Sequence, residues 1–235
     1  TALAIPGVTL LETSRNQRKL RQGAHCGNSF RIALRGVSVI DEPLRLLLER
    51  CRKSGVPNYF GEQRFGRDGN NVSLALAFFA GKRLKREDRS MAISAARSLL
   101  FNRLLELRVA AGTWHTLQPG ELASLDGSGS FFAVDEPDQA LHDRCAALDI
   151  HPTAVLWGKA AQRDGATRSE AEHAVARQFP GLAAGLEQHA DESRRALRLA
   201  VQDFNWSLDN GVLWLEFFLR RGGFATAVLR EIATY

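Results

Sequence analysis

Residues 55–66 read GVPNYFGEQRFG, and no other stretch of the chain says as much about the fold. The stretch holds three glycines, three aromatic residues and a proline, a composition that disfavours a helix. Its last two glycines bracket four residues as in a phosphate-binding loop, but Arg67 and Asp68 stand where such a loop needs Lys and Ser or Thr. Two interpretations stay open: an aromatic turn that seals a core, or a loop that brings its backbone, Gln63 and Arg64 close to a ligand.

The segments on either side of this stretch predict an α+β fold. Runs of β-branched or alternating apolar residues predict strands over residues 8–14, 29–34, 204–208 and 212–219. Asp209-Asn210-Gly211 separates the last two runs, and Asn-Gly in that position is a strong signal for a hairpin turn. Three- and four-residue spacing of apolar side chains predicts helices over residues 91–110, 137–148, 168–178 and 191–201. An N-cap at Asp41 and Pro43 at an early helical position predict a helix over residues 41–52, and a final helix is expected from about Phe224.

The helix expected over residues 91–110 has the most regular pattern. Asp88 is its predicted N-cap, and Asp41 is the predicted N-cap of the helix over residues 41–52. The apolar face of the longer helix is expected to consist of Ile93, Ala96, Leu100, Leu104, Leu107 and Ala111. Residues 122–132 indicate a short β or loop insert, and the Gly-Ser-Gly-Ser run at 127–130 is interpreted as its hairpin turn.

Composition excludes several classes of protein. Hydrophobic residues make up 45% of the chain and charged residues 24%, which is typical of globular domains. No run approaches the roughly 18 apolar residues of a membrane helix, so no membrane association is expected. Three widely spaced cysteines form neither a disulfide framework nor a zinc site and suit a reducing, cytoplasmic setting. The six histidines show no metal-ligand spacing, so no metal is expected.

The N-terminal part carries a local excess of positive charge. The net charge is only +5, yet no acidic residue occurs between Thr13 and Ile40, where six cations fall: Arg15, Arg18, Lys19, Arg21, Arg31 and Arg35. A solvated basic surface is one interpretation, and a surface that phosphates neutralise is the other. Asn28 and Phe30 add an amide and a stacking face, as in proteins that bind a splayed-out RNA base. The second basic cluster, at residues 82–86, is balanced by nearby acids and is interpreted mainly as solvated.

Residues 55–66 closely resemble the VPNYFG-x-QRFG signature of the TruD family of tRNA pseudouridine synthases. Three further segments resemble the family in the same order: RNQRKLRQGAHCGNSF at 15–30, SAARSLLFN at 94–102 and GGFATAVLRE at 222–231. The resemblance covers nearly the whole chain. It implies a catalytic sheet domain formed by residues 1–53 and 200–235. A largely helical family-specific domain, residues 54–199, would interrupt it, with a cleft between the two lobes.

The resemblance also implies a function. Family members isomerise a uridine of tRNA, at position 13, to pseudouridine through a flipped base and an aspartate nucleophile, with no cofactor. The expected partner is tRNA, and no protein partner is implied. In the family the nucleophile lies in a G-x-K-D type motif upstream of the basic run. No such motif occurs in these 235 residues, so the chain by itself is expected to be inactive. A non-catalytic RNA-binding module is the alternative.

Site residues follow from the same motifs. Asn28, Phe30 and Phe224 match family positions that contact the substrate. From the residues alone, core packing is the commoner role for both phenylalanines. Asn28 and Phe224 are expected to line one cavity, with the basic run at its mouth. The RNA-binding residues are expected to be Arg15, Arg18, Lys19, Arg21 and Arg64.

Overall fold

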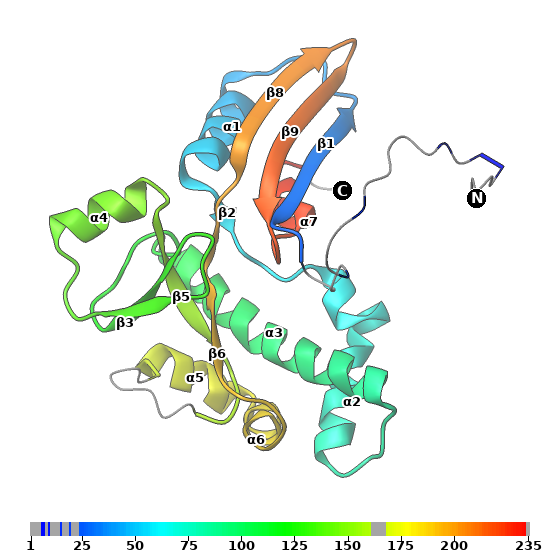
Figure 1. Ribbon diagram of the computed structural model, residues 1–235, viewed down its shortest axis with the longest axis vertical. Helices are drawn as coiled ribbons and strands as arrows, with labels where there is room; N and C mark the ends of the chain where they lie inside the picture. The colour runs from blue at the N-terminus through cyan, green and yellow to red at the C-terminus, as the bar shows by residue number, and fades with distance from the viewer. Residues whose placement is uncertain are drawn as a thin grey trace.

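The computed structural model describes residues 24–160 and 168–233, together with Pro6, Gly7, Thr9, Arg15 and Lys19. The strand expected over residues 8–14 therefore lies almost wholly outside the described residues. The fold is α+β, as predicted, and its described strands form three sheets of three, two and four strands (Figure 1). None of the described helices is both long and apolar enough to cross a lipid bilayer.

The first sheet joins the two ends of the described chain. Its strands are β1 (Gly27–Arg35), β8 (Gln202–Asp209) and β9 (Val212–Arg220), all antiparallel. The predicted Asn-Gly hairpin is confirmed, because Asn210 and Gly211 both have the positive φ that this two-residue turn needs. Since β9 lies between β1 and β8, the strand at the end of the basic run is paired with the C-terminal hairpin.

Two helices cover one face of this sheet. They are α1 (Glu42–Ser54) and α7 (Ala225–Ile232), which lie behind the strands in Figure 1. Alternate residues of β9, such as Leu213 and Leu215, are buried against them and form a core with Leu48 of α1. Full burial of each such leucine stabilises the fold by roughly 1.5–3 kcal/mol.

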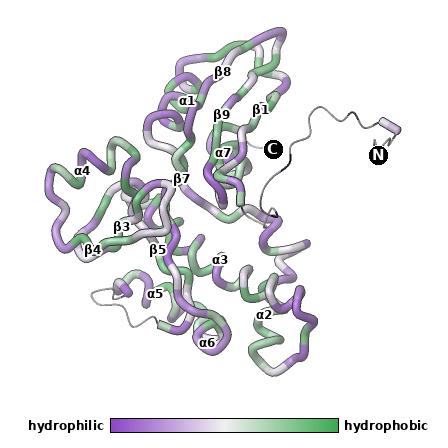
Figure 2. The backbone as a smooth tube through the Cα atoms, viewed as in Figure 1, coloured by the Kyte–Doolittle hydropathy of each residue, from purple (hydrophilic) through white to green (hydrophobic). Residues whose placement is uncertain are grey.

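α1 forms as the sequence predicts. The side chain of Asp41 accepts a hydrogen bond of 3.0 Å from the Leu44 amide, and Pro43 occupies the first turn, where its missing N–H costs nothing. Hydrophobic and hydrophilic residues alternate along the helix, as expected when one face is buried (Figure 2). The helix ends at Gly55, where β7 (Arg198–Leu199) passes so close that a Cβ atom would lie 2.4 Å from the Leu199 carbonyl oxygen.

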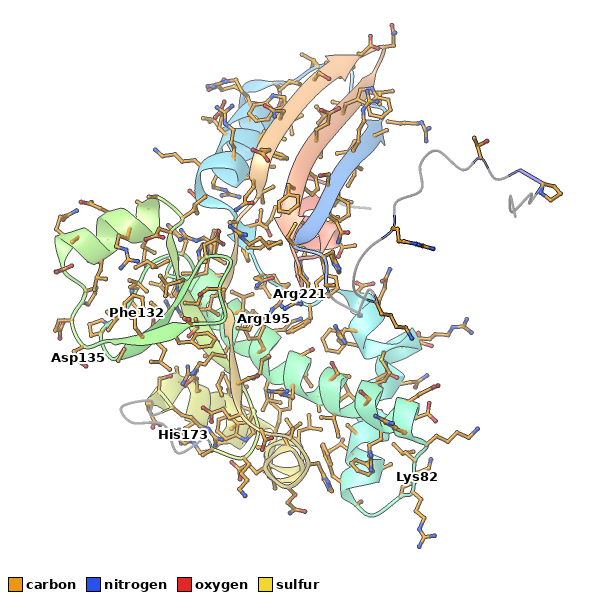
Figure 3. All side chains as sticks on the ribbon, in the orientation of Figure 1. Lys82, Phe132, Asp135, His173, Arg195 and Arg221 are labelled. Carbon is orange, nitrogen blue, oxygen red and sulfur yellow. The ribbon has the colours of Figure 1, made fainter. Side chains whose placement is uncertain are left out.

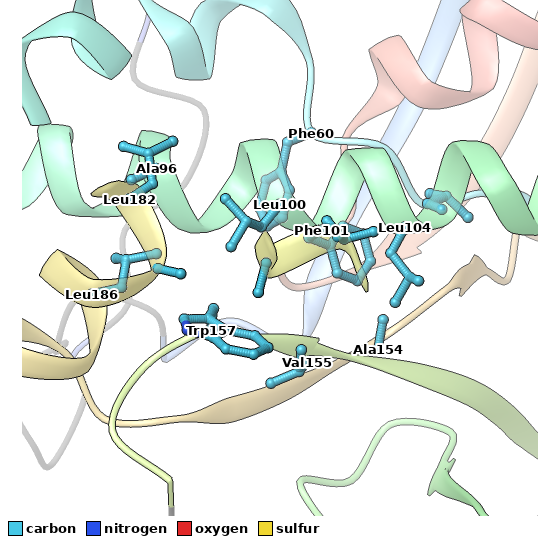
Figure 4. Packing of buried hydrophobic residues seen from close by; sticks show 14 of the residues in the cluster. Phe60, Ala96, Leu100, Phe101, Leu104, Ala154, Val155, Trp157, Leu182 and Leu186 are labelled. Carbon is cyan, nitrogen blue, oxygen red and sulfur yellow. The ribbon is translucent and has the colours of Figure 1, made fainter. Parts of the chain in front are cut away.

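The middle of the chain builds a second core. Its strands are β3 (Glu121–Leu125), β4 (Phe131–Val134), β5 (Ile150–Leu156) and β6 (Ser193–Ala196), which form a sheet in the order β4-β3-β5-β6. Its helices are α2 (Asn70–Phe79), α3 (Arg86–Ala110), α4 (Gln139–Ala146), α5 (Glu170–Gln178) and α6 (Pro180–His189). Figure 4 shows Leu100, Phe101 and Leu104 of α3 lying over Val155 and Trp157, at the centre of this core. The predicted hairpin between β3 and β4 and the predicted helices α4 and α5 are confirmed.

α3 corrects two details of the prediction. The helix begins earlier than expected, with Lys85 at the N-cap position. Asp88 therefore lies in the first turn, where its charge favours the helix dipole. Leu107 is 44% exposed instead of buried, whereas Phe101 and Leu105 are fully buried. The prediction assumed one apolar stripe, but α2, α5, α6 and β5 pack around α3 on several sides.

The helix predicted over residues 191–201 is wrong. This segment forms β6 and β7, which pair with β5 and with β2 (Val56–Pro57) respectively. Arg194 and Arg198 point into the structure, where Arg194 pairs with buried Glu172 and Arg198 donates to the carbonyl oxygens of Cys145 and Ile150. Strand pairing and these buried hydrogen bonds override the helical spacing of the apolar residues.

Candidate functional site

The segments singled out in the sequence meet around Phe60. The Phe60 amide donates to Oδ1 of Asn102 on α3, and Asn102 Nδ2 donates back to the Phe60 carbonyl oxygen, both at 2.9 Å. On its other side, the Phe60 ring lies 6.3 Å from the ring of Phe224, between centroids. Residues from the 55–66 loop, the central helix and the C-terminal motif therefore build one site.

The 55–66 loop combines features of both interpretations. Phe60 is 8% exposed and seals the second core, as the aromatic-turn interpretation requires. The following residues form a short 3₁₀ helix, η1 (Glu62–Phe65), and leave Arg64 half-buried at the surface, where its Nη1 donates to Ser94 Oγ at 2.9 Å. A Cβ on Gly61 would lie 3.2 Å from Thr226 Oγ1, so the loop passes close to α7. Approach of a ligand to this loop stays a prediction.

A cavity of about 650 Å³ opens beside this loop. Residues of the loop, of α3 and of the C-terminal motif line it, among them Tyr59, Gln63, Arg64, Met91, Phe224 and Arg230. The guanidinium of Arg230 lies 4.6 Å from the centre of the Tyr59 ring, and burial raises the pKa of the Tyr59 phenol. Aromatic faces next to cations are the groups that bind the bases and phosphates of single-stranded RNA.

A second cleft, of about 560 Å³, lies between the first sheet and the hairpin of β3 and β4. At its centre Asp126 accepts hydrogen bonds from His151 Nε2 at 3.1 Å, Arg220 Nε at 2.9 Å and Gln202 Nε2 at 3.3 Å. Burial by itself would raise the pKa of Asp126, but the bonds from His151 and Arg220 outweigh it and hold that pKa below its usual value. Asp126 thus links the two parts of the protein as a carboxylate.

The tautomer of His151 follows from its two partners. Arg198 Nε lies 3.1 Å from His151 Nδ1, and a guanidinium can only donate. Nδ1 is therefore the acceptor, and Nε2 carries the proton that it donates to Asp126. With both nitrogens committed in this way, His151 serves as a structural link and we assign it no proton-transfer role.

Arg195 of β6 lies near the middle of the molecule (Figure 3) and lines the cleft of about 560 Å³. Its guanidinium lies 4.2 Å from the centre of the Phe60 ring and donates to Asn58 Oδ1 at 2.5 Å and to the Gly222 carbonyl oxygen at 3.3 Å. Burial lowers the pKa of Arg195 to about 10, and the positive charge of Arg64 acts in the same direction. Sequence reasoning missed this residue because it fell inside the wrongly predicted helix.

The predicted site residues are only partly brought together. Phe224 lines the cavity of about 650 Å³, as described above. Asn28 is exposed on β1 opposite Leu219 and is not among the described residues that line either cavity. The ring of Phe30 stacks on that of Phe217, with 5.4 Å between centroids, and packs against the core that the first sheet forms with α1 and α7. Their contacts with substrate stay predictions.

The basic run is described only in part. Arg15 and Lys19 are exposed, whereas Arg18 and Arg21 lie outside the described residues. Its position at the mouth of a cavity stays a prediction. Among the residues that the structure describes, no cluster of His, Cys, Asp and Glu side chains could hold a metal ion.

Comparison with known proteins decides the family. Residues 1–82 and 74–232 match the family model described as tRNA pseudouridine synthase D (TruD). The chain belongs to the TruD family. It is 41% identical over 266 residues to the tRNA pseudouridine synthase D of Psychrobacter arcticus, covering 96% of this chain and 66% of the relative. It is 42% identical over 227 residues to that of Aeromonas salmonicida, covering 96% of this chain and 64% of the relative.

A solved structure agrees on the fold of this TruD chain. The putative tRNA pseudouridine synthase D from Methanosarcina mazei superposes with a TM-score of 0.64 at 20% identity, covering 89% of this chain and 69% of that one. The chain thus spans about two-thirds of the length of the curated TruD relatives, 64–66% for the two compared above. All four segments on which the resemblance to TruD was based lie within the matched residues.

Proposed function

We propose that the protein carrying this chain isomerises a uridine in tRNA to pseudouridine. Membership of the TruD family supports this, and so does one structural observation: three of the family-like segments meet at Phe60, in contact with Asn102 and Phe224. Two of these segments, the 55–66 loop and the C-terminal motif, line the cavity of about 650 Å³, and convergence of separate segments on a cavity is typical of a binding site. By resemblance to the family, we propose position 13 of the tRNA as the target.

The proposed reaction needs no other reactant. The bond from C1′ to N1 of the uracil breaks, the base turns, and a bond from C1′ to C5 forms. The proton lost from C5 is balanced by a proton gained at N1. A stacked base must first leave the helix, at a cost of roughly a few kcal/mol. Phe224 is half-buried at the edge of the cavity and offers a face on which the flipped base can stack.

We assign the nucleophile to none of the carboxylates described above. Asp126 already accepts three hydrogen bonds, and Glu172 is 3% exposed and paired with Arg194. By resemblance, the nucleophile is an aspartate of a G-x-K-D type motif. We also propose that residues 54–199 form an inserted domain, since its core around Phe101 is separate from the core around Leu215.

Release of tritium tests the proposed reaction. The substrate is tRNA transcribed with [5-³H]uridine, because formation of the bond from C1′ to C5 sends the tritium of the target uridine into water. We expect release that approaches one equivalent per tRNA, and none from a tRNA in which cytidine replaces uridine 13. Tight tRNA binding with no release would favour the alternative, a non-catalytic RNA-binding module.

A further inference from the structure

Two arginines share the ring of Phe60. The guanidinium carbon of Arg195 lies 4.2 Å from the ring centre and that of Arg64 lies 5.4 Å from it. Both are half-buried. Among the described residues, neither arginine forms an ion pair, and every hydrogen bond that the two side chains donate goes to a neutral oxygen. Two like charges thus lie against one aromatic ring, and no carboxylate of the described residues pairs with either.

This arrangement is costly unless something else neutralises it. A guanidinium removed from water loses hydration, and a neighbouring cation adds repulsion. Both effects lower the pKa of Arg195, to about 10. The Nε atom of Arg195 is also buried and makes no hydrogen bond with any described residue. Arg194 and Arg168 each pair with a glutamate, whereas buried Arg198 donates to neutral acceptors, namely His151 and two carbonyl oxygens.

We propose that Arg64 and Arg195 form one anion-binding site, and that its ligand is a backbone phosphate of RNA. The choice of RNA rests on the proposed function. We infer the anion from the two cations that share one ring and from the buried Nε of Arg195, which has no hydrogen-bond partner among the described residues. A guanidinium presents a planar fork of N–H donors that matches two phosphate oxygens. The Phe60 ring lies against both guanidiniums and restrains them.

The location fits a strand of nucleic acid. Arg64 lines the cavity of about 650 Å³ beside Phe224, and Arg195 lines the cleft of about 560 Å³ beside Gly222. A nucleotide whose base lies against Phe224 would share the larger cavity with Arg64, and Arg195 is joined to Arg64 through the Phe60 ring that both guanidiniums contact. The site supplies charge for the backbone and no contact that distinguishes one base from another.

The salt dependence of tRNA binding tests the shared site. Each phosphate contact contributes about 0.7–0.9 to the slope of log Kobs against log salt concentration. We expect Arg64→Gln and Arg195→Gln each to reduce the magnitude of that slope by about 0.7–0.9, and the double variant to reduce it by the same amount and no more. The matched control is Arg177→Gln on α5, an exposed arginine already paired with Glu170, which should keep the wild-type slope.

The outcomes separate the alternatives. Slopes for Arg64→Gln and Arg195→Gln equal to that of Arg177→Gln would overturn the proposal. A double variant whose slope falls by about 1.4–1.8 would mean two independent phosphate contacts and would overturn the single shared site. Arg195→Lys, which keeps the charge but not the fork, should keep the wild-type slope while binding tRNA more weakly. Circular dichroism of each variant verifies that it is folded.

Inorganic phosphate provides an independent probe. The Nε–H of Arg195 is buried, so its ¹H–¹⁵N resonance should be protected from solvent exchange and observable. Arg195→Lys identifies the resonance by its loss. We expect phosphate to shift it, and chloride at equal ionic strength to leave it in place. Equal responses to both salts would overturn the anion site even if the protein modifies tRNA. A phosphate-specific shift without tRNA binding would retain the site and contradict the proposed function.

Discussion

Replacing Asn102 should destabilise the protein more than replacing other exposed or half-buried asparagines. Its amide makes two hydrogen bonds of 2.9 Å to the backbone of Phe60, one as acceptor and one as donor. In Asn102→Ala both are lost. Phe60 is 8% exposed, so water reaches its freed backbone groups poorly.

The expected magnitude follows from these two bonds. Each contributes about 0.5–1.5 kcal/mol net, and a backbone group left unpaired in a buried place costs about 1–3 kcal/mol. We expect Asn102→Ala to lower the free energy of unfolding by about 2–4 kcal/mol. Asn102→Asp keeps the acceptor for the Phe60 amide but sets a carboxylate against the Phe60 carbonyl oxygen. It should not restore the wild-type value.

Urea denaturation followed by circular dichroism measures these changes. The matched control is Asn205→Ala on β8, an exposed asparagine whose side chain makes one hydrogen bond among the described residues, to the Asp203 carbonyl oxygen. It should change the free energy of unfolding by less than about 0.5 kcal/mol. An Asn102→Ala variant as stable as Asn205→Ala would refute the idea that this amide fixes the 55–66 loop.

Three further predictions concern buried polar groups. The pKa of Asp126 in the folded protein lies below its unfolded value of about 3.9, so the stability that this carboxylate contributes is present above that pH and is lost on acidification. Asp126→Asn should therefore flatten the acid side of a plot of Tm against pH. An unchanged profile would contradict this. Glu172→Gln leaves the charge of Arg194 buried without its partner, so the free energy of unfolding measured by urea denaturation should fall by about 3–5 kcal/mol. A fall of less than about 1 kcal/mol would contradict this. Burial raises the pKa of the Cys51 thiol to about 11. At pH 8 a disulfide reagent should therefore modify exposed Cys26 rapidly and Cys51 only when the protein unfolds. Equal rates of modification would show that Cys51 is accessible in the folded protein.

Local chemistry made part of the fold predictable from the sequence. The Asn210-Gly211 turn and the Asp41 cap each depend on residues within a few positions, so both were predicted correctly. β5 was missed because Pro152 argues against an inner strand. The structure nevertheless places β5 between β3 and β6, where the Pro152 carbonyl oxygen accepts from the Leu197 amide. α6 was missed because Gly185 weakens its pattern, and no local signal shows that the Phe79 ring packs where a side chain would be.

The site was predictable only as a set of motifs. The resemblance identified Phe60 and Phe224 as parts of family-like segments, but no spacing in the sequence requires them to meet. Arg195 carries no signal of its own, because its importance arises from partners such as Asn58 that lie more than a hundred residues away. The opposite holds for Asn28, which belongs to a family-like segment but is not among the described residues that line either cavity.

The central claim is that the cavity beside Phe224 receives the target uridine, and the rate of tritium release by Phe224→Leu tests it most directly. Base–aromatic stacking contributes about 1–3 kcal/mol, so kcat/KM should fall roughly 5- to 150-fold. Phe132→Leu, on β4 in a different core, is the control and should keep the wild-type value. If Phe224→Leu is folded and its kcat/KM stays within about twofold of wild type, the base does not bind there and the account is contradicted.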